Sequence, residues 1–202
     1  MAYNNFTLSK VKKDFGLAVD ETRNLFVNVE PAIPSDFLKQ ALSEYVPLAT
    51  AINTEKARSE LIIAPVMAEV RRQTGNRVSL FSGSAFDVDG ERGLTGYCDF
   101  ILSASKEQLE ITAPVVTVVE AKKEDLIGGI GQCIAAMVAA QMFNERAGNQ
   151  IQTIYGGVTS GTNWRFLNIQ SQTVCIDLIE YYIDRVENIL GILLLPLREN
   201  QF

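Results

Sequence analysis

Residues 94–133 read LTGYCDFILSASKEQLEITAPVVTVVEAKKEDLIGGIGQC, and this stretch decides the fold. An apolar run containing Asp99 is followed by a second run that ends in Glu120 and Lys122, and a helical pattern begins directly after it. Residues 115–119 are mostly β-branched, which is typical of a central strand buried on both faces. Because side chains alternate along a strand, Glu120 and Lys122 share one face. The sequence therefore predicts a small polar cluster at the end of a central strand.

The composition is that of an ordinary globular protein. The 202 residues are 47% hydrophobic and 21% charged, which suits one sizeable α/β domain. The absence of histidine excludes histidine general bases, histidine-containing triads and most catalytic zinc sites, so carboxylates and lysines must carry any chemistry. The net charge of −6 argues against a surface coated in basic residues for nucleic acid, although acids gathered around a metal would count toward that total.

The apolar segments and the cysteines bear on the predicted cellular location. The longest uncharged apolar stretch near the C-terminus, Ile189 to Leu197, is far below the roughly 20 residues of a membrane span, so we expect no transmembrane helix. The N-terminus lacks the apolar core of a signal peptide, and the three cysteines are odd in number and widely spaced. The sequence predicts a reduced, cytoplasmic protein without a membrane partner.

The first residues are predicted to form an extension. Residues 1–34 hold a short helix over 8–15 and a possible strand or hairpin over 21–30. We expect this extension to pack on a single domain formed by residues 35–202.

Two helices are predicted to open the domain. Ser35 or Asp36 caps the first, and Pro47 is expected to end or kink it. Apolar residues recur at helical spacing over 53–75, with Gly75 as a plausible stop.

The rest of the chain alternates between strand and helix patterns. The expected elements are antiparallel strands over 77–103 around the turn at Asp89–Gly90, the strand ending at Lys122, an Ala-rich helix over 124–148, two strands around Ser160–Gly161, a strand over 173–179, and an apolar helix from about 180 to 195. Together they predict an α/β fold with a mixed central β-sheet flanked by helices.

The polar cluster fits metal-assisted chemistry. Two carboxylates that converge from adjacent strands can hold Mg²⁺, or Mn²⁺ in its place, because such hard cations take oxygen ligands and keep several waters. A lysine beside the cation can orient or deprotonate the attacking water and stabilise charge on a phosphate. Asp99, Glu120 and Lys122 would therefore suffice for phosphodiester hydrolysis.

This set of residues resembles the PD-(D/E)XK, or restriction-endonuclease-like, nuclease superfamily. The matching residues are Asp99 and the triplet Glu120-Ala121-Lys122. The core of that superfamily is a helix, a three-strand antiparallel meander, a crossover helix and a further strand, and the order expected over residues 53–158 is similar. The resemblance implies that Asp99 and Glu120 are metal ligands, that the carbonyl of Ala121 contributes, and that Lys122 positions the water.

Two further residues extend the resemblance, which covers about half of the chain. Glu60 looks like the acid that is common on the first core helix of the superfamily, where it would be a metal ligand. Gln132 occupies a place similar to that of a glutamine found on the helix after the E-x-K strand in several subfamilies. Cys98, rather than proline, precedes Asp99, at a position that varies in the superfamily.

Each residue also has an ordinary structural explanation. Glu120 and Lys122 could be a same-face pair at a strand end, worth a few tenths of a kcal/mol. Glu60 could be a solvated helix residue, and Gln132 a polar residue on a helix face. Asp99 is harder to explain in this way, because an acid within an apolar run needs a partner if it is buried.

Three functions remain open at this stage. The first is a Mg²⁺-dependent nuclease, with DNA favoured over RNA because the superfamily favours it. The second is a non-enzymatic nuclease-fold module that binds or assembles, with its apolar C-terminal helix joining a protein partner or a second copy in a homodimer. The third is a metal-dependent hydrolase of a small phosphate ester. A neutral or acidic rim around Glu120 favours the last two, whereas nucleic acid is favoured by a basic rim of Arg71, Arg72, Arg77, Lys122 and Lys123.

Overall fold

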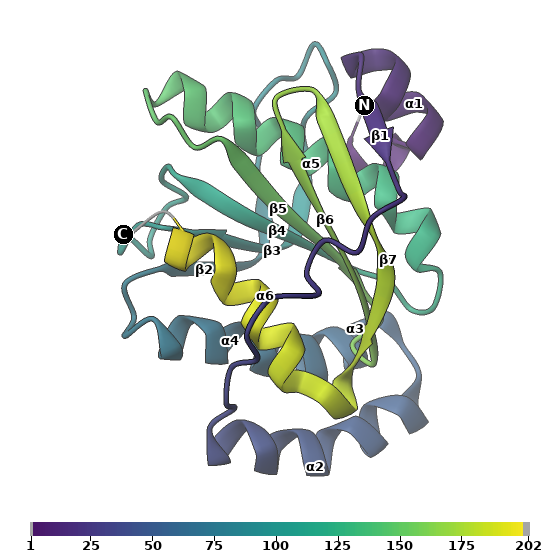
Figure 1. The fold of residues 1–202 in the computed structure, drawn as a ribbon, viewed down its shortest axis with the longest axis vertical. Helices are drawn as coiled ribbons and strands as arrows, with labels where there is room; N and C mark the ends of the chain where they lie inside the picture. Colours follow the sequence, from purple (N-terminus) through teal and green to yellow (C-terminus); the bar gives the residue numbers. More distant parts are fainter. Residues whose placement is uncertain (1, 200–202) are drawn as a thin grey trace.

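The computed structural model describes residues 2–199 and has an α/β architecture. Seven strands form one mixed sheet in the order β1-β7-β6-β5-β4-β3-β2, with helices on both faces (Figure 1). The strands are β1 (Ala18–Asp20), β2 (Ser79–Ala85), β3 (Tyr97–Ser103), β4 (Val115–Ala121), β5 (Thr153–Thr159), β6 (Asn163–Gln170) and β7 (Thr173–Tyr182). The helices are η1 (Tyr3–Asn5), α1 (Leu8–Phe15), α2 (Asp36–Ile52), α3 (Glu55–Arg58), the π-helical segment η2 (Ser59–Ile63), α4 (Ala64–Gln73), α5 (Leu126–Arg146), η3 (Ile183–Arg185) and α6 (Val186–Glu199). The predicted class, a mixed sheet flanked by helices, is confirmed.

The centre of the sheet sets the position of the polar cluster. Strands β2, β3 and β4 form an antiparallel meander, and β5 joins β4 in parallel after the crossover through α5. All seven residues of β4 are buried, as expected of a strand covered on both faces. The start of β3, the end of β4 and the end of β5 therefore lie at the same end of the sheet.

One face of the sheet is covered by α5, with α1 packed outside it. Helix α5 is rich in small residues, and a Cβ on Gly131 would lie only 2.5 Å from the carbonyl oxygen of Phe6 and 2.4 Å from the carbonyl carbon of Thr7. Among residues 2–199, α5 is the one helix long and apolar enough to cross a membrane, and 67% of its most apolar window is buried in this core. Its apolar character thus has a role in packing.

The opposite face is covered by the continuous run α3–η2–α4 and by α6, with α2 packed outside that run. Helix α2 passes through Pro47 to Ile52, so of the two expected effects of Pro47, an end or a kink, the end is wrong; the proline is exposed. The apolar residues of α6 lie in the core of the same chain: Val186, Ile189, Leu190, Ile192, Leu193, Leu194 and Leu197 are buried. The sheet itself therefore accounts for the apolar surface of this helix.

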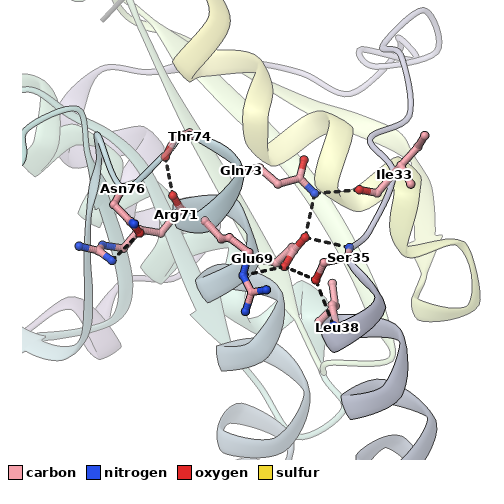
Figure 2. A network of polar contacts seen from close by, with 9 residues as sticks. Ile33, Ser35, Leu38, Glu69, Arg71, Gln73, Thr74 and Asn76 are labelled. Carbon is pink, nitrogen blue, oxygen red and sulfur yellow. Dashed lines mark hydrogen bonds and ion pairs between the residues drawn. The ribbon is translucent and has the colours of Figure 1, made fainter.

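A buried carboxylate joins α2 to α4 (Figure 2). Ser35 caps α2 by accepting from the backbone N–H of Leu38, 3.2 Å away. Glu69, only 3% exposed, accepts from the N–H of Ser35 at 2.9 Å, from its hydroxyl at 2.8 Å and from the side-chain amide of Gln73 at 3.0 Å. Burial alone would raise the pKa of Glu69, but these hydrogen bonds and the charge of Arg72 lower it. The carboxylate thereby fixes where the first helix of the domain begins.

The amino-terminal segment differs from its predicted form. No strand occurs over residues 21–30; instead β1 lies just upstream and pairs in parallel with β7. The N–H of Thr22 donates to Asp20, which turns the chain at the end of β1, and the N–H of Leu25 donates to the buried carboxylate of Asp177 at 3.1 Å. The backbone N–H groups of Thr22 and Leu25 thus donate to side-chain carboxylates, whereas in a hairpin they would donate to backbone carbonyls of the partner strand.

The contact at Gly131 leads to a stability prediction. Replacing a helical glycine by alanine normally stabilises a helix by about 0.5–1 kcal/mol, but here the new Cβ would meet backbone that cannot rotate away. We expect Gly131→Ala to lower the free energy of unfolding by about 1–3 kcal/mol in urea denaturation. Gly90→Ala is the control, because its Cβ would meet only Thr95 at 3.9 Å. Equal stability of the two variants would contradict the close approach of residues 6–8 to α5.

Candidate active site

Asp99 and Glu120 come together at the end of the central strands. The register that places Phe100 opposite Val119 brings Asp99 next to Glu120. The antiparallel ladder stops there, and a carboxylate oxygen of Asp99 accepts from the backbone N–H of Ala121 at 2.8 Å. The aspartate thus holds β3 to β4 with its side chain where the backbone pairing ends.

Glu120 is a buried acid. Its residue is 3% exposed, on the side of β4 that faces α5. Burial raises its pKa most, the nearby charge of Asp99 adds to this effect, and Lys122 acts in the opposite direction, so that the pKa is about 8. Glu120 is therefore poised to exchange its proton for another positive charge near neutral pH.

Lys122 is held in place by both the sheet and α5. Its ammonium group donates to Glu120 at 2.6 Å and to the side-chain oxygen of Gln132 at 3.2 Å. A Cβ on Gly129 would lie 3.0 Å from Cγ of Lys122, so the glycine makes room for the lysine stem. Burial lowers the pKa of Lys122, but the charge and hydrogen bond of Glu120 outweigh it and the pKa is raised. The structure thus brings Asp99, Glu120, Lys122 and Gln132 into one cluster.

A cavity of about 270 Å³ opens beside this cluster. Asp99 and Ala121 line it from the sheet, and Glu60 lines it from the π-helical segment η2. The side chain of Glu60 is 63% exposed and pairs with Lys56 at 3.7 Å. Glu60 therefore faces the same cavity as Asp99, but it is a solvated acid at the cavity wall.

Glu55 is a residue of this cavity that we did not single out from the sequence. It lies in the first turn of α3, fixed by Thr54, whose hydroxyl accepts from the N–H of Ala57 at 3.1 Å. Burial lowers the pKa of Lys122, whereas the charges of Glu120 and Glu55 both raise it. The sequence did contain a sign of Glu55: a threonine followed by an acid, Thr54-Glu55, is typical of the start of a helix.

The donor set is compatible with a hard divalent cation. Within residues 2–199, no three Asp, Glu or Cys side chains are grouped closely enough to hold a metal ion between them. Mg²⁺ usually needs only one or two carboxylates and keeps several waters, and the adjacent oxygens of Asp99 and Glu120 meet that requirement. Ala121, which lines the cavity, could add its carbonyl oxygen.

The basic rim expected for nucleic acid is only partly present. Arg71 and Arg72 lie at the far end of the helical run that starts at Glu55, roughly 24 Å away at 1.5 Å per residue, and Arg77 follows in the connection to β2. Arg72 pairs with Glu69 at 3.6 Å, and Arg71 donates to Asn76, so both serve the fold. Of the five basic residues in the expected rim, Lys122 and Lys123 are at the cluster.

Comparisons of the chain with protein-family models, with curated proteins and with solved structures found no match.

The pKa of Glu120 leads to a prediction about stability. Between the ordinary value of 4.5 and about 8, folded Glu120 holds a proton that the unfolded chain has lost. The free energy of unfolding should therefore fall as pH rises through this window, by up to about 1.4 kcal/mol per pH unit from this group. Urea denaturation in EDTA should show this fall in the wild type and a flatter profile in Glu120→Gln. An unchanged profile in the variant would contradict the burial of this acid; Glu107→Gln, at an exposed loop position, should behave as wild type.

Proposed function

We propose that this protein is a divalent-cation-dependent hydrolase of phosphodiester bonds in nucleic acid, with DNA as the favoured substrate. The observation that carries the proposal is the position of the Lys122 ammonium, held between Glu120 and Gln132 beside the carboxylate of Asp99. Further support comes from the order of elements. A helix, an antiparallel meander, a crossover helix and a parallel strand follow one another, as the resemblance to the PD-(D/E)XK superfamily implies.

The proposed roles follow from the chemistry of the groups. Asp99, Glu120 and the carbonyl of Ala121 would hold Mg²⁺ or Mn²⁺, which supplies Lewis-acid activation of a phosphate oxygen and of water. Lys122 has a raised pKa and stays an ammonium, so its role is to donate a hydrogen bond to the water or to a phosphate oxygen. Gln132 fixes the direction of that ammonium.

Cation binding would also relieve an unfavourable arrangement. Two neighbouring carboxyl groups repel one another when both are ionised, and burial adds to the cost at Glu120. A divalent cation between Asp99 and Glu120 would offset both effects. The pair is then better suited to a bound cation than to an empty, fully ionised site.

A specific observation favours a second candidate, a hydrolase of a small phosphate ester. Three acids, Glu55, Glu60 and Asp99, line the cavity of about 270 Å³, whereas Lys56 is its one basic residue among those described. Such a lining suits a small ester bound through cations better than a long polyanion. The non-enzymatic module has less support, because the apolar residues of α6 that motivated it are buried in the chain's own core.

Two substitutions separate the metal ligand from the water-orienting group. Glu120→Gln replaces an ionisable carboxyl group by a neutral amide with little change in size, so it should abolish Mg²⁺-dependent cleavage of DNA and weaken cation binding. Lys122→Ala should lower the cleavage rate by about 10²- to 10⁴-fold while largely sparing cation affinity, because an ammonium is not a ligand. Calorimetric titration with Mn²⁺ and a gel assay on single- and double-stranded DNA measure the two effects.

Matched controls come from the loop between β3 and β4, at the other end of the sheet. Glu107→Gln and Lys106→Ala make the same changes of charge at exposed positions and should leave both measurements unchanged. Wild-type protein that binds neither Mg²⁺ nor Mn²⁺ and cleaves no nucleic acid would refute the proposed nuclease. Cleavage of a small phosphodiester alone would support the second candidate.

A further inference from the structure

A second cavity, of about 340 Å³, lies on the other side of the end of β4. Ala121 lines the first cavity and Lys123, two residues later, lines the second. Arg58 from α3 and the turn between β5 and β6, including Ser160 and Thr162, complete the basic and hydroxyl part of its wall. The two cavities therefore lie on either side of the end of β4, and the second contains two basic side chains where the first contains one.

Arg58 is a buried cation without a carboxylate partner. It is 8% exposed, and its guanidinium donates to the carbonyl of Ser160 at 3.0 Å, to the hydroxyl of Thr162 at 3.2 Å and twice to the side-chain oxygen of Asn53. All these acceptors are neutral, and Arg58 takes part in none of the ion pairs within residues 2–199. Of the five N–H donors of a guanidinium, one on Nη2 has no acceptor in that part of the chain. Buried charges are normally paired, so this cation indicates a missing anion.

One neighbour of Arg58 in this cavity, Lys123, adds a second positive charge. Lys123 is exposed and belongs to no ion pair among the described residues. Three acids also line the cavity, and one of them is neutralised by an ion pair, Glu180 with Arg165 at 2.7 Å; Asp125 accepts from the backbone N–H of Gly128 at 2.9 Å and keeps its charge. The third, Glu124, lies within 3.5 Å of the side-chain amide of Asn53.

We infer that this second cavity binds a phosphate group, through the guanidinium of Arg58, the ammonium of Lys123 and the hydroxyl groups of Ser160 and Thr162. A guanidinium and an ammonium that converge on one anion make charge-assisted hydrogen bonds. The hydroxyl groups of Ser160 and Thr162 are bonded to each other at 3.2 Å, so one of them has a proton left to donate to the anion. The inference rests on the proposed function for the identity of the occupant. The phosphate is one that neighbours the scissile phosphate on the same strand, so the substrate is a nucleic-acid strand rather than a small ester with a single phosphate.

Direct binding of inorganic phosphate tests the cavity without any catalysis. Calorimetric titration in EDTA excludes phosphate held through a divalent cation. The wild type should bind phosphate, and Lys123→Ala and Arg58→Lys should each weaken the affinity about tenfold or more, the latter because lysine lacks the planar fork. Lys106→Ala is the matched control and should bind as wild type. Absence of phosphate binding, or equal affinity in all variants, would overturn the inference.

Arg58 also supports the turn between β5 and β6, so Arg58→Lys could fail to fold; Lys123→Ala and Thr162→Val, at less buried positions, then decide the result.

A second measurement connects the cavity to the proposed reaction. With Mg²⁺ present, Lys123→Ala should raise KM for a twelve-residue oligonucleotide about tenfold, and it should raise KM less for bis(p-nitrophenyl) phosphate, which has a single phosphate. Equal losses on the two substrates would overturn the assignment of the phosphate to the substrate strand. If the wild type hydrolysed neither compound, the proposed function would fail, while the titration with inorganic phosphate would still accept or reject the binding site.

Discussion

The candidate site depends on one buried carboxyl group, that of Glu120 at the end of β4. A buried acid must be neutral or compensated, and Lys122 at 2.6 Å compensates Glu120 in part, since the pKa of Glu120 stays raised to about 8. The lysine can do so only because α5 begins at the right place, with Gln132 as a second acceptor and Gly129 leaving room for the lysine stem. The position of Lys122, and with it the charge balance of the site, therefore depends on how α5 packs on the sheet.

The topology explains why chemistry gathers at this end of the sheet. Strand β4 is covered by α5 on one face and by the helical run α3–η2–α4 with α6 on the other, so charged groups reach solvent only at its end. The crossover makes β5 parallel to β4, which brings the turn at Ser160 to the same end. That turn packs on the π-helical segment at Ile62, and Arg58 bonds to it. Segments that are far apart in the sequence thus converge on one surface.

Local rules were sufficient for much of the fold and part of the site. Alternation placed Glu120 and Lys122 on one face of β4, and capping rules found Ser35, where α2 begins. Glu60 was chosen for its likeness to the acid on the first core helix of the superfamily, and that likeness did not point to Glu55, which lies at the capped start of α3. The burial of Arg58 could not be predicted in this way, because it depends on a tertiary contact with the β5–β6 turn that no local sequence pattern indicates.

The net charge of −6 is a poor guide to what binds at this end of the molecule, because some charged residues stabilise the fold and others line the two cavities. Arg72 pairs with the buried Glu69 that fixes α2, far from the site, and Glu55 and Glu60 line the cavity next to Asp99. Arg58 and Lys123 lie across β4 with no acid paired to either among the described residues. A polyanion bound at this end of the sheet interacts mainly with charges that lie within about a Debye length, roughly 8–10 Å at ordinary ionic strength. The sign of the whole chain therefore does not argue against a phosphodiester substrate, since cations can neutralise the acids of the first cavity while the second holds two basic side chains, one of them buried without a carboxylate partner.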